Sequence, residues 1–256
     1  MPEGGEYVAS VPLAVECVAL RKRYRGGVLA LDSLNLSVGP GESVGIMGHN
    51  GAGKTTLFRV LQGLIKATDG SAEILGAPAG SPSAVRRLGA MGDIGFYPFL
   101  TAEHNLQLLA RYGGIGQARV REVLRIVGLE DASRLTYGAF SLGMKQRLAL
   151  GAAIVKDPEL LILDEPSNGL DMAGQLAIRQ LISGFRSEGR ALLIASHNVE
   201  EVELLCDRAC ILDGGNVAAQ VMTGEGSGDG EQLRQALLAS SMTRRLAAWG
   251  HSKAPS

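Results

Sequence analysis

The sequence predicts an α/β fold with a mostly parallel sheet, and three observations lead to this prediction. Short apolar runs alternate with stretches of helical periodicity along the chain, which is typical of alternating strands and helices. Two of these runs, 160–163 and 191–195, lack alternating polar residues, as expected of strands buried on both faces. From about 101 to 155 strand signals fade and helical spacing dominates. We therefore expect an α-helical subdomain inserted into an α/β core.

The individual elements follow from the same patterns. Strands are expected near the N-terminus at Val15–Leu20, Leu34–Val38 and Ser43–Met47. A helix is expected over 55–64, because apolar residues recur at intervals of three and four: Leu57, Val60, Leu61 and Leu64. The glycine-rich stretch 223–230 has the composition of a flexible linker, and a short solvated helix is expected at about 231–249, with a partner-docking helix as the alternative.

These boundaries give one main domain over 1–220 and a tail over 221–256 that holds the linker and the short helix. Within the main domain, the core is expected to span 14–95 and 156–220. The helical subdomain is expected to span about 96–155, where the composition shifts.

Composition and charge narrow the class of protein. The chain has 256 residues, of which 46% are hydrophobic and 20% charged, which excludes a disordered chain. With 25 basic and 26 acidic residues the formal net charge is −1, so no nucleic-acid partner is expected. No apolar run approaches the roughly 20 residues of a membrane span.

The expected location is the cytoplasm. Residues 1–7 carry two glutamates and no basic residue, unlike a secretory signal. The three cysteines, Cys17, Cys206 and Cys210, are an odd number, which fits a reducing compartment. No histidine or cysteine pair completes a zinc site around Cys206 and Cys210, so buried thiols are expected.

A glycine-rich loop provides the first functional motif. Residues 48–55 fit the pattern G-x-x-x-x-G-K-[ST], between an expected strand and an expected helix. That order directs backbone N–H groups and a helix N-terminus at one point, which suits a polyphosphate. Lys54 would reach the β and γ phosphates, and the Thr55 hydroxyl would ligate Mg²⁺. A plain glycine-rich turn with an exposed lysine is the alternative interpretation.

A second motif is acidic. Asp164 and Glu165 end the apolar run 160–163, at the strand edge where α/β sheets bind ligands. Asp164 suits Mg²⁺, because a hard cation prefers oxygen ligands. Glu165 points the other way and can reach an attacking water. The alternative is an acidic strand exit that caps a turn, and the phosphate loop alone would also fit an adenylate or GTP kinase.

The segment Phe140-Ser-Leu-Gly-Met-Lys-Gln-Arg147 decides between these classes. Ser141 is a plausible helix N-cap, and Gly143 leaves the backbone bare at the helix start. Here the chain resembles the ATP-binding subunit of ABC transporters, whose signature L-S-G-G-Q is followed by Q-R. Ser141, Gly143, Gln146 and Arg147 match it, whereas Leu142 and Met144 depart from it as in the bacitracin, lantibiotic and multidrug exporter branch. An ordinary capped helix is the alternative.

The resemblance extends over about 14–216 and assigns further roles. Ser167 to Asp171 looks like the family's D-loop, so Asp171 is carried over as a nucleotide-contacting residue. His197 follows the last apolar strand, where the family's switch histidine lies, and Tyr24 matches the aromatic that stacks on adenine. A lone histidine is otherwise structural or solvated, and a lone aromatic otherwise packs in a core.

The resemblance also implies a fold, a nucleotide site and partners. The fold is the phosphate-loop NTPase core with an antiparallel N-terminal β portion. The nucleotide-binding residues are Tyr24, Gly48, His49, Asn50, Gly51, Ala52, Gly53, Lys54, Thr55, Thr56 and Asp171, with Ser141 and Gly143 acting on the partner subunit's nucleotide. The metal ligands are Thr55, Asp164 and Asp93. The last stands where the family has a longer glutamine or glutamate, and an ordinary loop aspartate is the alternative.

The implied activity is Mg²⁺-ATP hydrolysis by two subunits, identical or different, that close head to tail. Glu165 would polarise the attacking water, and His197 would hold the γ-phosphate. Closure would drive export through a separate integral membrane permease docked near 96–105, on the inner face of the cell membrane. The alternative is a soluble ABC-type ATPase acting on ribosomes or DNA. It is disfavoured because one cassette is present and only 87 residues separate Lys54 from Ser141.

Overall fold

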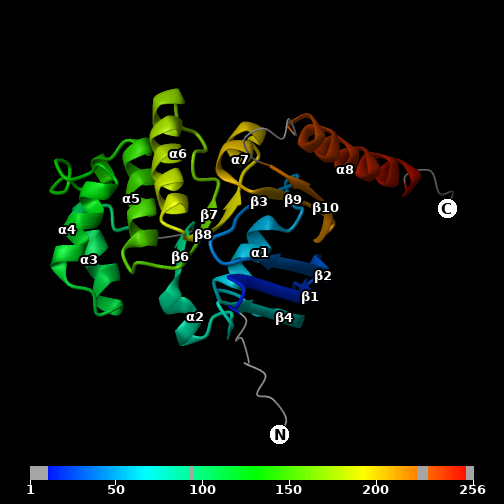
Figure 1. The fold of residues 1–256 in the computed structure, drawn as a ribbon, viewed down its shortest axis with the longest axis horizontal. Coiled ribbons are helices and arrows are strands. Elements are labelled where there is room, and N and C mark those ends of the chain that lie inside the picture. Colours follow the sequence, from blue (N-terminus) through cyan, green and yellow to red (C-terminus); the bar gives the residue numbers. More distant parts are fainter. Residues whose placement is uncertain (1–10, 93–94, 224–229, 252–256) are drawn as a thin grey trace, which may run out of the picture.

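The computed structural model describes residues 11–92, 95–223 and 230–251, which form two sheets and flanking helices (Figure 1). The first sheet is antiparallel and is built from N-terminal residues. Its strands are β1 (Val15–Arg23), β2 (Leu29–Val38), β4 (Asp69–Ile74) and β5 (Ala77–Pro78), in the order β2-β1-β4-β5. This arrangement confirms the antiparallel N-terminal portion expected from the resemblance.

The second sheet carries the site. In the described part of the chain its order is β10-β9-β3-β8-β7-β6, and all neighbouring pairs are parallel except β10 with β9. The strands are β3 (Ser43–Met47), β6 (Leu88–Met91), β7 (Leu160–Asp164), β8 (Ala191–Ala195), β9 (Arg208–Asp213) and β10 (Asn216–Met222). The predicted mostly parallel sheet is therefore confirmed.

Helices flank this sheet and form a block at one end of it (Figure 1). The helices are α1 (Lys54–Leu61), α2 (Pro82–Arg87), α3 (Ala102–Tyr112), α4 (Gln117–Ile126), the 3₁₀ turn η1 (Tyr137–Ala139), α5 (Leu142–Ile154), α6 (Met172–Ser187), α7 (Val199–Leu205) and α8 (Gly230–His251). The block at one end consists of α3, α4 and α5, which contact one another.

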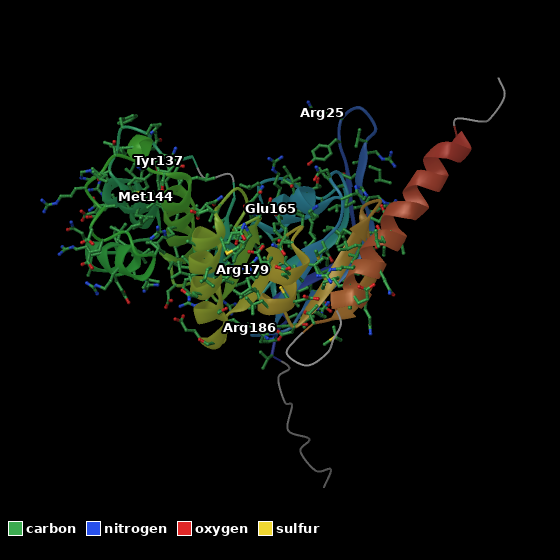
Figure 2. The ribbon with its side chains drawn as sticks, turned by 90° about the horizontal axis from the view of Figure 1, so that it is seen from above. Arg25, Tyr137, Met144, Glu165, Arg179 and Arg186 are labelled. Carbon is green, nitrogen blue, oxygen red and sulfur yellow. The ribbon has the colours of Figure 1, made fainter. Side chains whose placement is uncertain are left out.

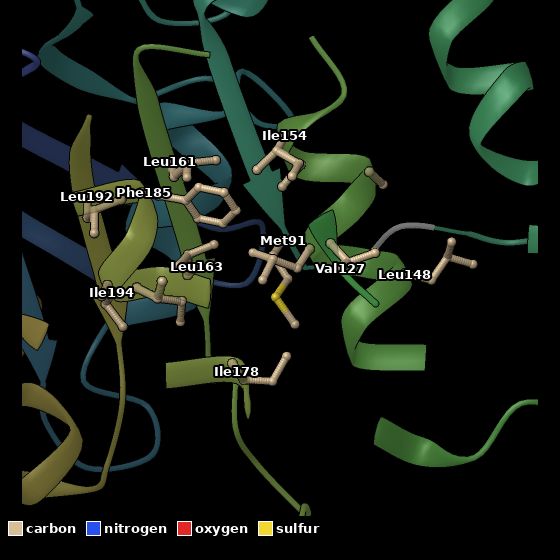
Figure 3. Close-up of a cluster of buried hydrophobic side chains, with 14 of the residues drawn as sticks. Met91, Val127, Leu148, Ile154, Leu161, Leu163, Ile178, Phe185, Leu192 and Ile194 are labelled. Atoms are coloured by element: carbon tan, nitrogen blue, oxygen red, sulfur yellow. The ribbon is translucent and has the colours of Figure 1, made fainter. Parts of the chain in front are cut away.

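Alternate residues of the central strands divide between two buried clusters, because successive side chains of a strand point to opposite faces. Leu161 and Leu163 of β7 join a cluster with α5 and α6, in which Ile178 and Phe185 also lie (Figure 3). On the opposite face Leu160 and Ile162 pack in a cluster with α1 and the antiparallel sheet. The absence of polar alternation in β7 thus reflects burial on both faces.

The helix after the phosphate loop is shorter than predicted. Leu57, Val60 and Leu61 are buried as expected, but α1 ends at Leu61, and Leu64 is exposed. Gly63 adopts a positive φ of 74°, and a Cβ there would stand 2.3 Å from the Gly80 Cα. The left-handed turn at Gly63 stops the helix before the fourth apolar residue is reached.

The C-terminal helix was expected to be solvated, and this prediction is wrong for its first turns. Leu233 is fully buried, and Ala236 and Leu237 are partly buried against the larger core cluster. The spacing of three and four residues places these side chains on one face, which packs on α7, β9 and β10. The linker predicted at 223–230 falls mostly outside the described residues.

All three cysteines are free and buried, as predicted. Burial raises the pKa of Cys17 and of Cys206 to about 12, and that of Cys210 to about 11. Within the described residues no helix has the length and apolar character needed to span a bilayer.

Candidate functional site

Three loops meet at one edge of the parallel sheet. Strands β3, β8 and β7 are neighbours, and the loop that follows each begins at the same carboxyl edge. These loops start at Gly48, Ser196 and Glu165 respectively. Open α/β sheets bind ligands at this edge, so the topology brings together segments separated by more than a hundred residues.

The first loop, residues 48–55, is shaped by its glycines. Gly48 has φ +146°, and a Cβ there would stand 2.4 Å from the Leu212 carbonyl oxygen. Gly53 has φ +112°, and its Cβ would stand 2.6 Å from the Ala30 carbonyl oxygen. Only glycine combines these backbone angles with such close approach. The loop leads directly into α1 at Lys54, which directs a helix N-terminus at the site.

Two side chains brace the same loop. The Lys54 ammonium donates to the carbonyl oxygens of Gly48 at 2.5 Å and of His49 at 3.2 Å, so it lies across the loop. The His49 Nε2 atom lies 2.9 Å from the Asp213 Oδ1 atom at the end of β9. The loop is therefore attached both to its own lysine and to the neighbouring strand.

The loop after β7 places a carboxyl group next to a histidine of the loop after β8. The Glu165 N–H donates to the Ala195 carbonyl at 2.9 Å, and Glu165 adopts a left-handed φ of +49°, which a non-glycine residue rarely takes. Its Oε2 atom lies 2.7 Å from the His197 Nδ1 atom. Glu165 lies between the helical block that carries Tyr137 and Met144 and the strand turn that carries Arg25 (Figure 2).

A cavity of about 680 Å³ opens at this edge, and most of the predicted nucleotide-binding residues line it. The predicted residues that line it are Tyr24, His49, Asn50, Gly51, Gly53, Lys54, Thr55, Thr56, Asp164 and Glu165. Tyr24 is a third exposed and its hydroxyl lies 3.3 Å from the Thr56 Oγ1 atom, so it stands at the cavity wall and not in a core. Gly48 and Ala52 belong to the same loop without lining the cavity.

Other predicted residues lie elsewhere. Ser141 caps α5 by accepting from the Met144 N–H, which confirms the predicted N-cap, and Gly143 lies in the first turn of that helix. Asp171 caps α6 by accepting from the Gly174 N–H at 2.8 Å. None of these three lines the cavity of its own chain. The predicted Asp93 lies outside the described residues.

The structure adds residues that were not predicted to line the site. Met91 and Gly92 line the cavity from the end of β6, and Gln146 and Ala149 line it from α5. Val28, Leu29 and Ala30 line it from the start of β2. Gln146 could have been found, because it belongs to the signature segment. The apolar residues of this group belong to no motif, because only the tertiary fold brings them to the cavity.

The donor set suits a divalent cation shared with a phosphate. Thr55 and Asp164 both line the cavity and offer a hydroxyl and a carboxylate. Among the described residues, histidine, cysteine, aspartate and glutamate form no cluster of three or more that could enclose a metal. Mg²⁺ is typically held by one or two carboxylates together with substrate phosphates, so these residues fit it.

The fold and this edge define a nucleotide-binding ATPase built on a phosphate loop. A family model described as "ABC transporter" matches residues 31–168, more than half of the chain. The bacitracin transport ATP-binding protein BcrA of Bacillus licheniformis is 42% identical over 212 residues, covering 81% of this chain and 69% of that protein. The Nod factor export ATP-binding protein I of a Rhizobium strain is 33% identical, covering 81% and 70%.

Solved structures agree with these relatives. A dimeric ATP-binding cassette in a post-hydrolysis state, with ADP and phosphate bound, superposes with a TM-score of 0.75 at 25% identity, covering 81% of this chain and 98% of that one. An ATP-binding subunit of an ABC transporter gives 0.75 at 28% identity, covering 88% and 94%. The chain belongs to the ABC transporter family, as an ATP-binding subunit with ATPase activity.

Proposed function

We propose that this chain is the ATP-hydrolysing subunit of an exporter and that it hydrolyses Mg²⁺-ATP at the carboxyl edge of its parallel sheet. The observation that carries the proposal is the convergence of Lys54, Asp164 and Glu165 on one cavity. Phosphoryl transfer requires positioning and charge neutralisation more than covalent chemistry, and a phosphate loop opposite two carboxyl groups supplies both.

Each residue then has a role. The Lys54 ammonium would turn from the loop carbonyls to the β and γ phosphates, and Tyr24 would stack on the adenine. Thr55 and Asp164 would hold Mg²⁺, which neutralises phosphate charge when bound. Asp93 would be a third metal ligand. Glu165 would orient and polarise the attacking water, while His197, in contact with it, would hold the γ-phosphate.

The assembly that we propose is a head-to-tail dimer, with the same or a related subunit as partner. Ser141 and Gly143 lie at the N-terminus of α5, away from their own chain's cavity, so they are free to cover the nucleotide of a partner. Asp171 would contact the nucleotide across the same interface. The structural relative with ADP and phosphate bound is itself dimeric, which supports this arrangement.

A permease would dock on the loop after β6, at the inner face of the cell membrane. Tyr97 and Phe99 are 52% and 72% exposed there, and their ring centroids are 5.7 Å apart. The buried Asn105 side chain accepts from the Tyr97 N–H at 2.8 Å and donates to the Tyr97 carbonyl at 3.1 Å. Asn105 thus fixes the backbone of the loop, while the Tyr97 and Phe99 rings stay exposed on its surface. We propose that 96–155 acts as the subdomain that transmits closure.

Export is favoured by the name of one relative, the Nod factor export ATP-binding protein I, while the name of the BcrA relative gives bacitracin transport without a direction. An ATPase acting on ribosomes or DNA is the competing function. Purification of the tagged chain from detergent-solubilised membranes separates the two, because we expect a polytopic membrane protein to copurify and ATPase activity to be lost in EDTA. Recovery of ribosomes or DNA in place of a membrane protein would contradict the proposal.

A further inference from the structure

A buried carboxyl group lies behind the site and is not explained by nucleotide binding. Glu201, in the first turn of α7, is 2% exposed, and both of its oxygens accept a hydrogen bond from a serine. The Ser196 hydroxyl donates to the Oε2 atom at 2.6 Å, and the Ser167 hydroxyl donates to the Oε1 atom. Both serines are also buried. Burying a carboxyl group is costly, so these contacts require a physical reason.

The two serines belong to the two catalytic loops. Ser167 follows Glu165 by two residues, and Ser196 directly precedes His197. Since Glu165 and His197 are themselves in contact at 2.7 Å, the two loops are joined twice, once at the cavity and once behind it. The chain from Glu165 to Ser167, through Glu201 to Ser196 and back through His197, closes a ring of contacts.

The remaining contacts hold Glu201 in place. Asn198 caps α7 by accepting from the Glu201 N–H at 3.3 Å, and the Asn198 N–H donates to the Ser196 Oγ atom at 3.1 Å. The Ser196 N–H donates to the Ile46 carbonyl at 3.3 Å, at the end of the strand that leads into the phosphate loop. Ser196 thereby links Glu201 to the parallel sheet.

Glu165 has a backbone conformation that its own residue type does not favour, so contacts around it must maintain that conformation. Its φ of +49° lies in the left-handed region, where a non-glycine residue persists only if surrounding contacts determine it. The only described contact of its backbone N–H is with Ala195, and the Ser167–Glu201 bond fixes the chain two residues further on.

We propose that Glu201 is a positioning residue for ATP hydrolysis, which holds the Glu165 and His197 loops in one geometry through Ser167 and Ser196. This inference rests on the proposed roles of Glu165 and His197. Glu201 does not line the cavity, so it contacts no nucleotide and acts only through the two loops. Its loss should therefore reduce turnover and leave nucleotide affinity unchanged.

The test compares Glu201→Ala with Glu201→Gln and Glu42→Ala. Glutamine keeps the side-chain length and can bond both serines, because a serine oxygen also accepts. Glu42 serves as the matched control: its carboxyl group accepts from Arg208 at 2.6 Å and from the Gly39 N–H at 2.7 Å, at the opposite edge of the sheet. Melting temperature, ATP affinity and steady-state ATPase kinetics are measured for all three variants, below their melting temperatures.

We expect Glu201→Ala to lower kcat about ten- to a hundredfold with KM for ATP nearly unchanged, since a misplacement of about 1 Å can reduce the rate about a hundredfold. Glu201→Gln should recover most of the turnover, and Glu42→Ala should lose stability with kcat unchanged. If Glu201→Ala loses stability only, like Glu42→Ala, the proposal is overturned.

A smaller change covers the case in which Glu201→Ala fails to fold. Ser167→Ala removes one hydroxyl and leaves the Ser196–Glu201 bond in place, so a selective fall in kcat is again expected, and unchanged kcat would overturn the proposal. The proposed function and the proposed role of Glu201 can be tested separately. If Glu165→Gln hydrolyses ATP normally, the proposed function fails, whereas a normal Glu201→Ala beside an inactive Glu165→Gln overturns only this inference.

Discussion

The phosphate loop and the loop after β7 line the same cavity, and the loop after β8 adjoins them through the contact of His197 with Glu165. The phosphate loop is held in shape by different means from the other two. The phosphate loop is shaped by its backbone, because Gly48 and Gly53 take positions where any Cβ would collide with a carbonyl oxygen. The loops after β7 and β8 are held by side chains, through Glu165, His197 and the buried Glu201. We therefore expect nucleotide affinity to depend mainly on backbone geometry, and turnover to depend on the side-chain network.

The largest effect should come from placing a side chain on the phosphate loop. Gly48→Ala would place a Cβ 2.4 Å from the Leu212 carbonyl oxygen in a backbone conformation that alanine disfavours. We expect ATP affinity, measured by calorimetry, to fall about a hundredfold, which is about 2.7 kcal/mol.

Gly51→Ala is the control for that experiment. Gly51 also has a positive φ, +83°, but a Cβ there would meet no atom within 4 Å. It isolates the backbone strain from the collision, so its effect should be clearly smaller. Equal losses of affinity in the two variants would show that the collision with Leu212 does not matter.

A smaller effect is expected where a side chain braces the backbone-shaped loop. His49→Ala removes the contact of Nε2 with Asp213, and Asp213→Asn alters the same pair from the β9 side. Because a single hydrogen bond contributes about 1 kcal/mol, ATP affinity should fall about fivefold in each variant. At saturating ATP, kcat should be unchanged. A fall in kcat without any loss of affinity would contradict the division between the two kinds of loop.

The smallest effect is expected from Cys206, which is buried in the larger core cluster. Burial raises the pKa of Cys206 to about 12 from 9.0, so the folded state retains the thiol proton at a pH where the unfolded chain has lost it. This contribution to stability is complete below pH 9 and decreases as the pH rises toward 12. We expect Cys206→Ala, measured by urea unfolding, to lose stability less steeply than the parent chain over this range. Parallel pH profiles would contradict the assignment.

Sequence patterns predicted the phosphate loop and Glu165 because both are local. A glycine motif between a strand and a helix, and a carboxyl pair at the end of an apolar run, are visible within ten residues. His197 and the antiparallel sheet were predicted only through family resemblance. The strand β4 begins with exposed Asp69 and Gly70, so it carries no apolar pattern of its own.

Contacts between residues far apart in the sequence could not be predicted from local sequence patterns. Glu201 lies 34 residues from Ser167, and nothing in its local sequence distinguishes it from its exposed neighbour Glu200. The end of α1 depended on the left-handed turn at Gly63, and the packing of α8 depended on where β9 and β10 lie. Each of these features depends on tertiary structure that local patterns do not encode.

Glu165 is proposed to act in hydrolysis at a nucleotide site that a second subunit completes. The most direct test is to mix Glu165→Gln with Mg²⁺-ATP and to measure both its mass in solution by light scattering and its rate of phosphate release. We predict a stable dimer that forms only with nucleotide, together with a fall in hydrolysis of about a hundredfold or more, as is usual when a general base is lost. A monomer that hydrolyses ATP at the normal rate would contradict the account.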